Sequence, residues 1–398
     1  MNNDNLDLEK QSGDVTASEE SNKTMYVPDM DVLNYGKGAD DADPSLLDQF
    51  KVDGDGADET DSHKNDETKK KDKDKDKDKT KGNGFIRFIK MIIPRKKDGA
   101  KTIIIKSVSI VAALAFIGSA VYLSVYFGNL NSQNHVISGA RDTYNLNRDN
   151  YTYNDDGQFS KFDTLKAQNS DIVGWISIKG TDVDNPVYQT SDNDYYITHD
   201  MNREVNSYGA LFLDYRCDID RLSLTQNQII YGHNMRYGAM FGTLRNYRDI
   251  EYYKKNPVIN FDSLYESMQY KIFAIMIVNT STDDTFGYEF SAYRSEFSSQ
   301  EDFLLWTEYC KARSLVDTTV DIQPCDEVIT LSTCCYDFTD ARFVIVGRRV
   351  REGESSDVDV ESATVNSDVI YSKEYYEKKR IPIPEVEAPT ISVYESTK

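Results

Sequence analysis

Two adjacent cysteines are the residues of this sequence best suited to nucleophilic chemistry. Cys334 and Cys335 follow the β-rich run Val328–Thr333 and precede a polar turn. A cysteine nucleophile needs a thiolate, a base that forms or holds it, and hydrogen-bond donors for the oxyanion. The period-two alternation of a strand places Cys334 on a polar face with Ser332, and Cys335 on the more apolar face. The alternation therefore favours Cys334 as the nucleophile.

Histidine is scarce, so a general base for this thiol has few candidates. The chain has four histidines, and only His199 and His233 lie in its β-rich part. His233 comes directly after the apolar run Gln228–Tyr231 and Gly232, whose backbone freedom allows a turn at the strand end. Loops at such ends often display reactive side chains, whereas His199 lies in a polar stretch. Taken alone, either histidine is more often a surface or packing residue than a catalyst.

Arg342 is the cation that a short hairpin would bring next to Cys334, because it opens the following apolar run Phe343–Val346. A fixed guanidinium beside the thiol would lower the thiol pKa and offer donors to a tetrahedral oxyanion. The alternative is that Arg342 forms an ion pair with Asp337 or Asp340 on the surface. The residues themselves leave both interpretations open.

Short β-rich runs separated by turn residues must position these side chains, and they indicate a mainly β fold, a barrel or a sandwich. The expected strands are 173–178, 183–187, 210–215, 228–231, 270–278, 328–333 and 343–350. A short helix is expected at Phe159–Gln168, and a longer one over residues 303–314 after the capping box formed by Ser298 and Glu301. Cys310 falls on the apolar face of the longer helix and is expected in the core.

A segment before the β-rich part has the composition of a membrane span. Residues 107–128 carry no charge, and about 20 apolar residues suffice to cross a hydrocarbon core of about 30 Å. A cleaved signal peptide is disfavoured because the run starts after residue 100. The preceding segment, residues 81–106, is basic, so the positive-inside rule predicts a cytoplasmic N-terminus and an extracellular C-terminal part.

Composition excludes several classes of protein. A net charge of −21 argues against nucleic-acid binding, which requires a basic surface. Five cysteines without paired spacing argue against a disulfide framework or a zinc site, and no metal or cofactor is expected. The apolar fraction, 39%, lies below the globular norm of about 45–50%, so part of the chain is expected outside any packed core.

The predicted organisation has six parts. They are a disordered cytoplasmic arm (1–80), the basic juxtamembrane segment (81–106), a transmembrane helix (107–128), a spacer (129–157), a catalytic domain (158–352) and an acidic, disordered tail (353–398). The arm carries a Lys-Asp repeat whose like charges at i and i+4 disfavour a helix.

Several motifs in order resemble class B sortases. Thr330–Cys334 (TLSTC), followed by Arg342, is similar to the signature around the sortase nucleophile. Tyr231–Met235 (YGHNM) and Gly238–Gly242 (GAMFG) resemble the class B branch specifically. Further agreement comes from VGWI at 173–176, NPV at 185–187, DNDYY at 192–196 and LDYR at 213–216. The resemblance covers about residues 158–350 and leaves out the arm and the tail. Cys335, directly after the nucleophile position, departs from the pattern.

The resemblance implies a closed sortase-type β-barrel with added helices and a cysteine transpeptidase. Cys334 takes the nucleophile's position, His233 that of the general acid/base, and Arg342 that of the oxyanion and substrate clamp. Ser332 is a weaker candidate for binding substrate, and a solvated strand hydroxyl is the alternative. The implied partners are secreted proteins with a C-terminal sorting motif, a cell-wall peptide amine and membrane lipid.

Two other functions remain open at this point. One is a sortase that polymerises pilin subunits, in which a lysine side chain supplies the resolving amine. The other is an inactive, membrane-tethered module that binds peptides on the barrel. The presence together of Cys334, His233 and Arg342 argues against this second function.

Overall fold

The computed structural model describes residues 93–95, 97–220, 224–235, 238–282, 288–385 and 389–390. The arm predicted at 1–80, the first part of the basic segment and the last residues of the tail lie outside the described residues. The chain divides into two compact units, of which one contains residues 133–398 and the other residues 34–132. Each unit is described separately below.

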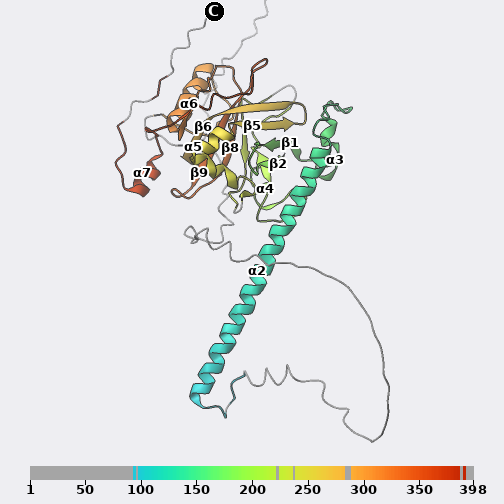
Figure 1. Cartoon of the computed structure of the whole chain (residues 1–398), viewed down its shortest axis with the longest axis vertical. Coiled ribbons are helices and arrows are strands. Elements are labelled where there is room, and N and C mark those ends of the chain that lie inside the picture. The colour runs from blue at the N-terminus through green and yellow to red at the C-terminus, as the bar shows by residue number, and fades with distance from the viewer. Residues whose placement is uncertain are drawn as a thin grey trace, which may run out of the picture. The chain divides into compact units, whose positions relative to one another are not determined.

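A closed β-barrel forms the centre of the unit that contains residues 133–398 (Figure 1). Its strands follow the order β1-β2-β3-β4-β8-β9-β6-β5. They are β1 (Ile172–Ser177), β2 (Asp184–Tyr188), β3 (Leu211–Leu213), β4 (Asn227–Tyr231), β5 (Val258–Ser263), β6 (Ser267–Asn279), β8 (Val328–Cys334) and β9 (Ala341–Arg349). Closure pairs every strand of the barrel on both sides and so removes exposed sheet edges. The expectation of a closed barrel with helices is confirmed.

Every strand expected from the β-rich runs is present, within a few residues of its expected ends. β5 was missed, although its burial alternates along the strand, because Asn260 and Asp262 interrupt its apolar character. The Asp262 carboxylate is bound within the protein, because it accepts hydrogen bonds from Lys161, at 2.6 Å, and from Tyr144. A polar residue in a strand is compatible with the barrel when buried donors face it.

Helices and short turns cover the barrel between strands. They are η2 (Ser160–Phe162), α3 (Asp163–Gln168), α4 (Tyr195–Thr198), η4 (Gly242–Arg248), α5 (Ile250–Lys255), α6 (Gln300–Arg313) and α7 (Lys373–Lys379). The helix expected at Phe159–Gln168 is thus a 3₁₀ turn followed by one turn and a half of α-helix.

The long helix α6 is present, but its N-cap differs from the expected one. Ser299, not Ser298, is the cap, and its hydroxyl accepts a hydrogen bond from the Asp302 backbone N–H at 3.1 Å. The Asp302 carboxylate accepts from the Ser298 hydroxyl at 2.8 Å and pairs with Arg294, which holds the pKa of Asp302 down at about 2. Cys310 is fully buried on this helix, as expected.

The C-terminal segment differs from the expected disordered tail over the residues that the structure describes. Thr364–Val365 (β10) pairs with Val316–Asp317 (β7), which together form a two-stranded sheet. Ile370 and Tyr376 are buried, with exposed fractions of 6% and 4%. Composition suggested disorder because the segment is acidic and poor in apolar residues. A few buried side chains are nevertheless enough to order such a segment when it packs on a folded surface.

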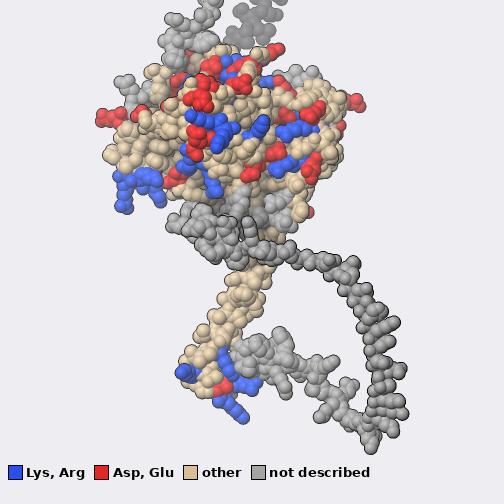
Figure 2. Space-filling model, viewed as in Figure 1, with Lys and Arg blue, Asp and Glu red and all other residues tan. Residues whose placement is uncertain are grey.

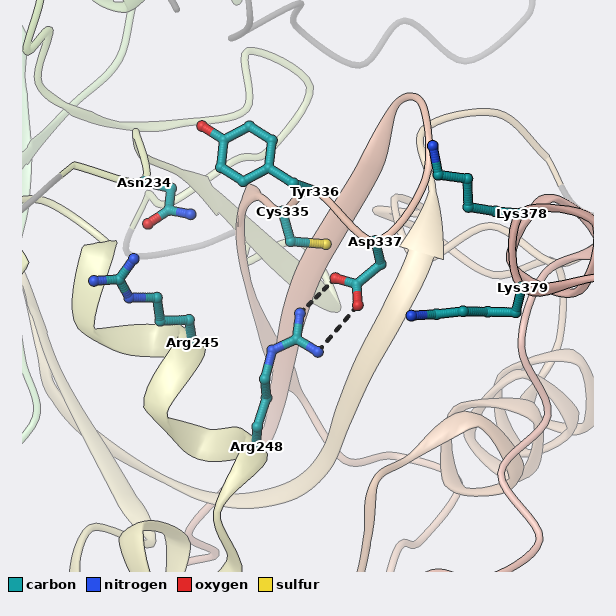
Figure 3. Close-up of a pocket in the computed structure, with 8 residues that line it drawn as sticks. All are labelled: Asn234, Arg245, Arg248, Cys335, Tyr336, Asp337, Lys378 and Lys379. Atoms are coloured by element: carbon teal, nitrogen blue, oxygen red, sulfur yellow. Dashed lines mark hydrogen bonds and ion pairs between the residues drawn. The ribbon is translucent and has the colours of Figure 1, made fainter. Parts of the chain in front are cut away.

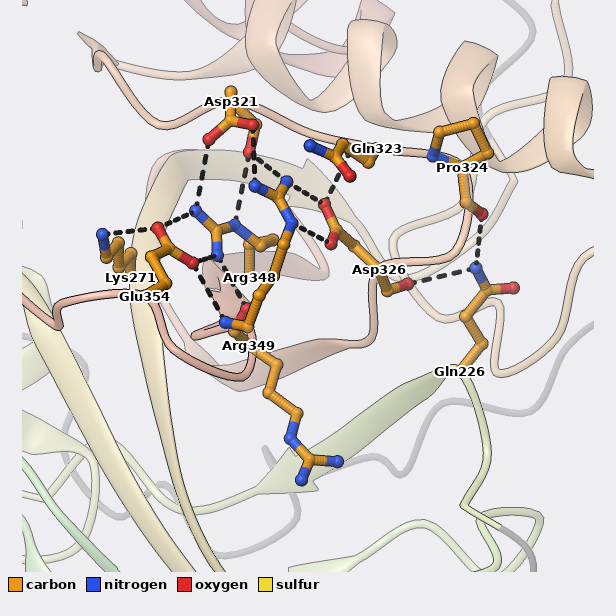
Figure 4. Close-up of polar contacts among 10 residues, drawn as sticks. Gln226, Lys271, Asp321, Gln323, Pro324, Asp326, Arg348, Arg349 and Glu354 are labelled. Carbon is orange, nitrogen blue, oxygen red and sulfur yellow. Dashed lines mark hydrogen bonds and ion pairs between the residues drawn. The ribbon is translucent and has the colours of Figure 1, made fainter. Parts of the chain in front are cut away.

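An ion-pair network fixes the start of this segment to the end of β9 (Figure 4). Glu354 accepts hydrogen bonds from Lys271 at 2.6 Å and from Arg348 at 2.8 Å. Arg351 pairs with Asp321 at 2.8 Å and with Asp326 at 2.7 Å. Because Arg348 is only 1% exposed, its pairing replaces the water that burial removes.

The helix α2 (Ala100–Leu146) begins in one unit and ends in the other. Its part Ala100–Val125 is long and apolar enough to cross a membrane, and none of the most apolar stretch is buried. In Figure 2 the middle of this helix shows no acidic or basic side chains. The segment overlaps the transmembrane helix predicted at 107–128.

The last turns of α2 pack on the barrel unit to which they belong. Tyr144 is 1% exposed and stacks on Trp175 with ring centroids 4.3 Å apart. Arg141 forms an ion pair with Asp184 at 2.9 Å. Part of the stretch expected as a polar spacer, residues 129–157, is therefore helical and packed, because its tyrosine and arginine meet complementary groups on β1 and β2.

Candidate active site

The three residues expected to carry the chemistry come from a row of three neighbouring strands, on two of them and just after the third. β8 and β9 are antiparallel, and Cys334 lies directly opposite Arg342. β4 runs parallel to β8, with Tyr231 opposite Ser332, and the Gly232 N–H donates to the Ser332 carbonyl at 3.1 Å. His233 follows Tyr231 by two residues, just as Cys334 follows Ser332 by two residues on β8. The barrel order β4-β8-β9 therefore places the strand of Cys334 between the strand that precedes His233 and the strand of Arg342.

The pairing of Cys334 with Arg342 brings their side chains to the same face. The Cys335 N–H donates to the Ala341 carbonyl at 3.0 Å, so Cys334 and Arg342 form the adjacent pair without mutual hydrogen bonds. In such pairs the Cα atoms are about 4.5 Å apart and the side chains are closest. Both side chains are almost completely buried, with exposed fractions of 3% and 1%. The predicted hairpin thus forms as expected.

Asp337, one of the two alternative partners considered for Arg342, is engaged elsewhere. Asp337 pairs with Arg248 through two hydrogen bonds, of 3.2 and 2.5 Å. Arg248 also lies over the Phe343 ring, 5.1 Å from its centroid. Because Arg342 is buried in the barrel, it does not form the surface ion pair with Asp337 that the sequence left open.

His233 is held in one orientation by the backbone of α4. It is 6% exposed, and its Nε2 lies 2.8 Å from the carbonyl oxygen of Ile197. A carbonyl can only accept, so Nε2 carries the hydrogen and Nδ1 is the other ring nitrogen. His199 has a different environment, since it stacks on Tyr195 with centroids 4.1 Å apart and its Nδ1 lies 2.8 Å from the Tyr195 carbonyl.

Gly232 is needed here for close packing. A Cβ at this position would lie 2.3 Å from a methyl carbon of Leu211 and 2.8 Å from the Phe241 ring. The sequence suggested backbone freedom at a turn as the reason for this glycine. The structure shows that lack of a side chain lets the chain before His233 pass directly over the barrel core.

Asn234 and Tyr293 are two further residues of the site that the sequence reasoning did not single out as functional. The Asn234 side-chain amide donates to the carbonyl oxygen of Cys334 at 2.9 Å, which ties the loop after β4 to the end of β8. Tyr293 is fully buried, and its hydroxyl lies 3.1 Å from the Ser332 hydroxyl. Burial raises the pKa of Tyr293, whereas the nearby Arg342 opposes this effect. Position within the YGHNM motif could have revealed Asn234, but no sequence signal indicates Tyr293.

Ser332 is fully buried and its hydroxyl is engaged by Tyr293, so it is not the solvated strand hydroxyl that the sequence offered as an alternative. Beneath it, Tyr231 donates to Asp214 at 2.9 Å, and Arg216 pairs with Asp214 at 2.7 Å. Burial opposes ionisation of Asp214, but the hydrogen bonds from Arg216 outweigh it and lower the pKa of this carboxyl. The LDYR stretch thus supplies a buried charge pair that supports β4.

Cys335 differs from its neighbour in electrostatic environment. Burial raises the pKa of the Cys335 thiol, and the Asp337 carboxylate raises it further. A thiol with a raised pKa forms little thiolate at neutral pH and is a weak nucleophile. Cys335 therefore fits a structural role, as the strand alternation suggested.

A cavity of about 430 Å³ opens on the Cys335 side of the row. Figure 3 shows its lining, which combines the loop after β4, the 3₁₀ helix η4, the loop after β8 and the helix α7. The lining residues are Asn234, Arg245, Arg248, Cys335, Tyr336, Asp337, Lys378 and Lys379.

Comparison with known proteins gives this arrangement a family. A sortase domain model matches residues 176–350. Sortase B of Listeria monocytogenes is 32% identical over 253 residues, which cover 63% of this chain and 98% of that protein. Sortase B of Staphylococcus aureus is 32% identical over 193 residues, or 48% of this chain and 75% of that protein. The chain belongs to the sortase family.

Solved structures of similar proteins include sortase B from Bacillus anthracis in complex with AAEK1. It is 27% identical, covers 56% of this chain and 99% of that chain, and has a TM-score of 0.49. The Staphylococcus aureus sortase B–substrate complex is also 27% identical and has a TM-score of 0.49, with 56% of this chain and 97% of that chain covered.

Membership of the family makes this protein a sortase transpeptidase, related to sortase B. The family match ends at residue 350. The C-terminal segment that packs on the barrel, and that supplies Lys378 and Lys379 to the cavity, therefore lies beyond the matched domain.

Proposed function

We propose that this sortase is a membrane-anchored cysteine transpeptidase. It cleaves a C-terminal sorting motif of secreted proteins and joins them to a cell-wall peptide amine through a thioacyl intermediate. The observation that supports the proposal is the register of the barrel, which sets Cys334 opposite Arg342 and brings the strand before His233 to the other side of β8.

Cys334 is the nucleophile of the proposed reaction. Its Sγ adds to the carbonyl carbon of the scissile peptide bond, and the carbonyl oxygen becomes an oxyanion. Arg342, directly opposite on β9, donates hydrogen bonds to this oxyanion and orients the substrate. When the carbon–nitrogen bond breaks, a thioester to Cys334 remains and the downstream peptide leaves as an amine.

His233 moves the protons in both halves of the reaction. It protonates the leaving amine and then accepts a proton from the incoming cell-wall amine as that amine attacks the thioester. Because Nε2 is bound to the Ile197 carbonyl, Nδ1 is the nitrogen assigned to this transfer. Ser332 remains a weaker candidate for substrate binding, and it would act together with Tyr293, to which it is hydrogen-bonded.

The candidate span Ala100–Val125 supports a single-pass anchor. The sequence places basic residues before this span, among them Lys96 and Lys97, and few after it. The positive-inside rule then gives a cytoplasmic N-terminus and an extracellular catalytic domain. This orientation brings the site to the compartment where secreted proteins and cell-wall amines meet.

A peptide-library cleavage assay with the full chain in detergent tests the function. The wild-type protein is expected to cleave a restricted set of peptides and, with an amine present, to form a joined product that mass spectrometry identifies. A thiol-reactive analogue of the cleaved peptide is expected to label Cys334. Labelling of Cys335 instead, or equal cleavage by a Cys334→Ala variant, would refute the assignment.

The isolated product also separates the proposed role from pilus assembly. Protein joined to wall peptide supports anchoring, whereas a ladder of proteins joined through lysine side chains would replace it with polymerisation. Binding without cleavage or labelling would revive the inactive peptide-binding module.

A further inference from the structure

The helix α7 brings two lysines to the edge of the active site from outside the matched sortase domain. Lys378 and Lys379 line the cavity of about 430 Å³ together with Cys335, which directly follows Cys334 in the chain. Asn234, on the opposite side of the cavity, holds the Cys334 carbonyl. The cavity therefore adjoins the end of β8 through Cys335 and Asn234, although the three candidate catalytic residues do not line it.

The lysines are held at this position by several independent contacts of the C-terminal segment. Near its start, Glu354 binds Lys271 and Arg348 (Figure 4). In its middle, Thr364–Val365 pairs with β7. At α7 itself, Tyr376 is 4% exposed, and its hydroxyl accepts from the Tyr371 N–H at 3.1 Å. The segment is thus anchored along its length.

The cavity concentrates positive charge on an acidic protein. Four of its lining residues are cations and one, Asp337, is an acid that is already paired with Arg248. Among the described residues, Arg245, Lys378 and Lys379 take part in no ion pair. Figure 3 shows Arg245 on one side of the Arg248–Asp337 pair and both lysines on the other. In Figure 2, basic side chains gather over α7.

The chain as a whole carries a net charge of −21, so this concentration is not a general feature of its surface. Three cations around one opening attract an anion, and an arginine and two lysines can donate to a carboxylate together. The substrates of peptide transfer are peptides, whose anionic groups are carboxylates. Peptide carboxylates are therefore the ligand chemistry that this lining fits best.

We propose that the cavity between η4 and α7 binds a carboxylate of a substrate, with Arg245, Lys378 and Lys379 as its ligands. The inference rests on the proposed transpeptidase function and adds a specificity site to it. The carboxylate comes either from the amine acceptor or from an acidic residue of the sorting peptide. In both cases the C-terminal segment selects substrates, although it contributes nothing to the bond-forming step.

A footprint that does not depend on turnover tests the binding. Surface lysines of the full chain in detergent are acetylated with and without N-acetyl-triglycine, which has a free carboxylate, or its amide, which has none. Lys378 and Lys379 are expected to react several-fold more slowly with the acid and at an unchanged rate with the amide. Lys373, which is on the same helix but does not line the cavity, is the internal control.

A second pair of blocked peptides covers the other source of the carboxylate. N-acetyl-Gly-Glu-Gly amide is compared with N-acetyl-Gly-Gln-Gly amide in the same footprint. Protection by the free C-terminal carboxylate alone assigns the acceptor, and protection by glutamate alone assigns the sorting peptide. Equal reactivity of both lysines with all four peptides overturns the proposal, whether or not the protein cleaves any substrate.

Turnover gives the second measurement. Triglycine and triglycine amide are compared as acceptors, and Glu and Gln versions of a cleaved library peptide as donors. The double variant Lys378→Gln/Lys379→Gln is expected to raise KM for the carboxylate-bearing partner about five-fold, with little change in kcat. The matched variant Lys373→Gln is expected to behave as wild type.

The two proposals fail in different ways. A protein that cleaves no peptide contradicts the transpeptidase function, and the footprint still decides the carboxylate site. A protein that cleaves peptides but discriminates neither acid from amide nor Glu from Gln contradicts the carboxylate site alone.

Discussion

Two buried arginines at opposite ends of β9 have the same exposure and different surroundings. Arg342 and Arg348 are each 1% exposed. Arg348 donates to Glu354 at 2.8 Å and lies 3.3 Å from Asp321. Arg342 faces Cys334 across the β8–β9 pair and donates to the Ala341 carbonyl at 3.3 Å. One arginine thus meets carboxylates and the other meets a thiol.

We propose that the two arginines also serve different roles. Hydrogen bonds from Arg348 lower the pKa of Glu354, so this arginine stabilises the fold and fixes the C-terminal segment. The charge opposite Arg342 develops on a substrate oxygen during the reaction that we propose, so this arginine stabilises a transition state. Residue type and burial are equal at both positions, and the tertiary partners assign the roles.

The largest effect is expected at the thiol end of this comparison. Cys334→Ala removes the nucleophile and should lower kcat by more than about 10³-fold in a fluorogenic sorting-peptide assay. Cys335→Ala should keep most of the activity, because burial and Asp337 raise the pKa of the Cys335 thiol. The reverse pattern would exchange the roles of the two cysteines.

The substitution Arg342→Gln should have the next largest effect on activity. Loss of an oxyanion donor typically lowers kcat by about 10²–10³-fold, and the peptide assay measures it directly. Arg342→Lys, which keeps the charge but not the planar fork, should recover only part of the loss. A purely structural Arg342 would instead leave the kcat of the folded protein unchanged.

At the opposite end of β9, Arg348→Met should reduce stability and spare the chemistry. It leaves Glu354 without a principal partner and should lower the free energy of unfolding by about 3 kcal/mol, measured by urea titration. The kcat of the protein that remains folded should stay within about two-fold of wild type. A loss of kcat comparable to that of Arg342→Gln would abolish the distinction between the two ends.

The stability of the network at this end should depend on acid pH. Hydrogen bonds from Arg348, and to a smaller extent from Lys271, lower the pKa of Glu354 below its usual 4.5, although burial opposes them. The unfolded chain therefore binds the proton more readily, and the contribution of Glu354 is complete above pH 4.5 and declines as the pH falls below it. Glu354→Gln should cost about 1–2 kcal/mol at neutral pH.

Urea titrations of wild type and Glu354→Gln from pH 7 to pH 3 check this dependence. The difference in unfolding free energy between them should shrink as the pH falls. A difference that stays constant over this range would show that the Glu354 charge does not stabilise the network.

The smallest effect is expected beneath the active-site row. Tyr293→Phe removes the hydrogen bond to the Ser332 hydroxyl and should lower the free energy of unfolding by about 1 kcal/mol. Ser332→Ala should cost a similar amount. If Ser332 also binds substrate, as the sequence suggested, its variant should raise KM, and Tyr293→Phe should do so as well.

Much of the barrel could be predicted from local pattern. Alternating β-branched and aromatic residues predicted the strands from β1 to β9 with the exception of β5 and β7. The TLSTC motif and the following arginine predicted the hairpin that sets Cys334 opposite Arg342. The N-cap of α6 was displaced by one residue because serine is a good cap at either position. The structure distinguishes them, since the Ser299 hydroxyl accepts from the Asp302 N–H whereas the Ser298 hydroxyl donates to the Asp302 carboxylate.

Other features depended on contacts between distant segments. Tyr293 has no motif around it, and it reaches Ser332 from the connection between β6 and α6, 39 residues away in the chain. Ile370 and Tyr376 lie in an acidic segment whose composition predicts disorder, and they are buried against a surface built by residues far away in the chain. The domain boundaries stay a prediction.

By itself the sequence determined the chemistry available to this protein, since its scarce histidines and one cysteine–arginine hairpin leave few choices. Strand periodicity and motif order are local properties, so they can be recognised in the sequence without a structure. Only the tertiary structure decided the register that sets Cys334 opposite Arg342, the carboxylate partners of Arg348, and the position of Lys378 and Lys379 at the cavity beside Cys335. These features depend on closure of the barrel and on packing of the C-terminal segment. Both are stabilised by contacts between residues that lie far apart in the sequence.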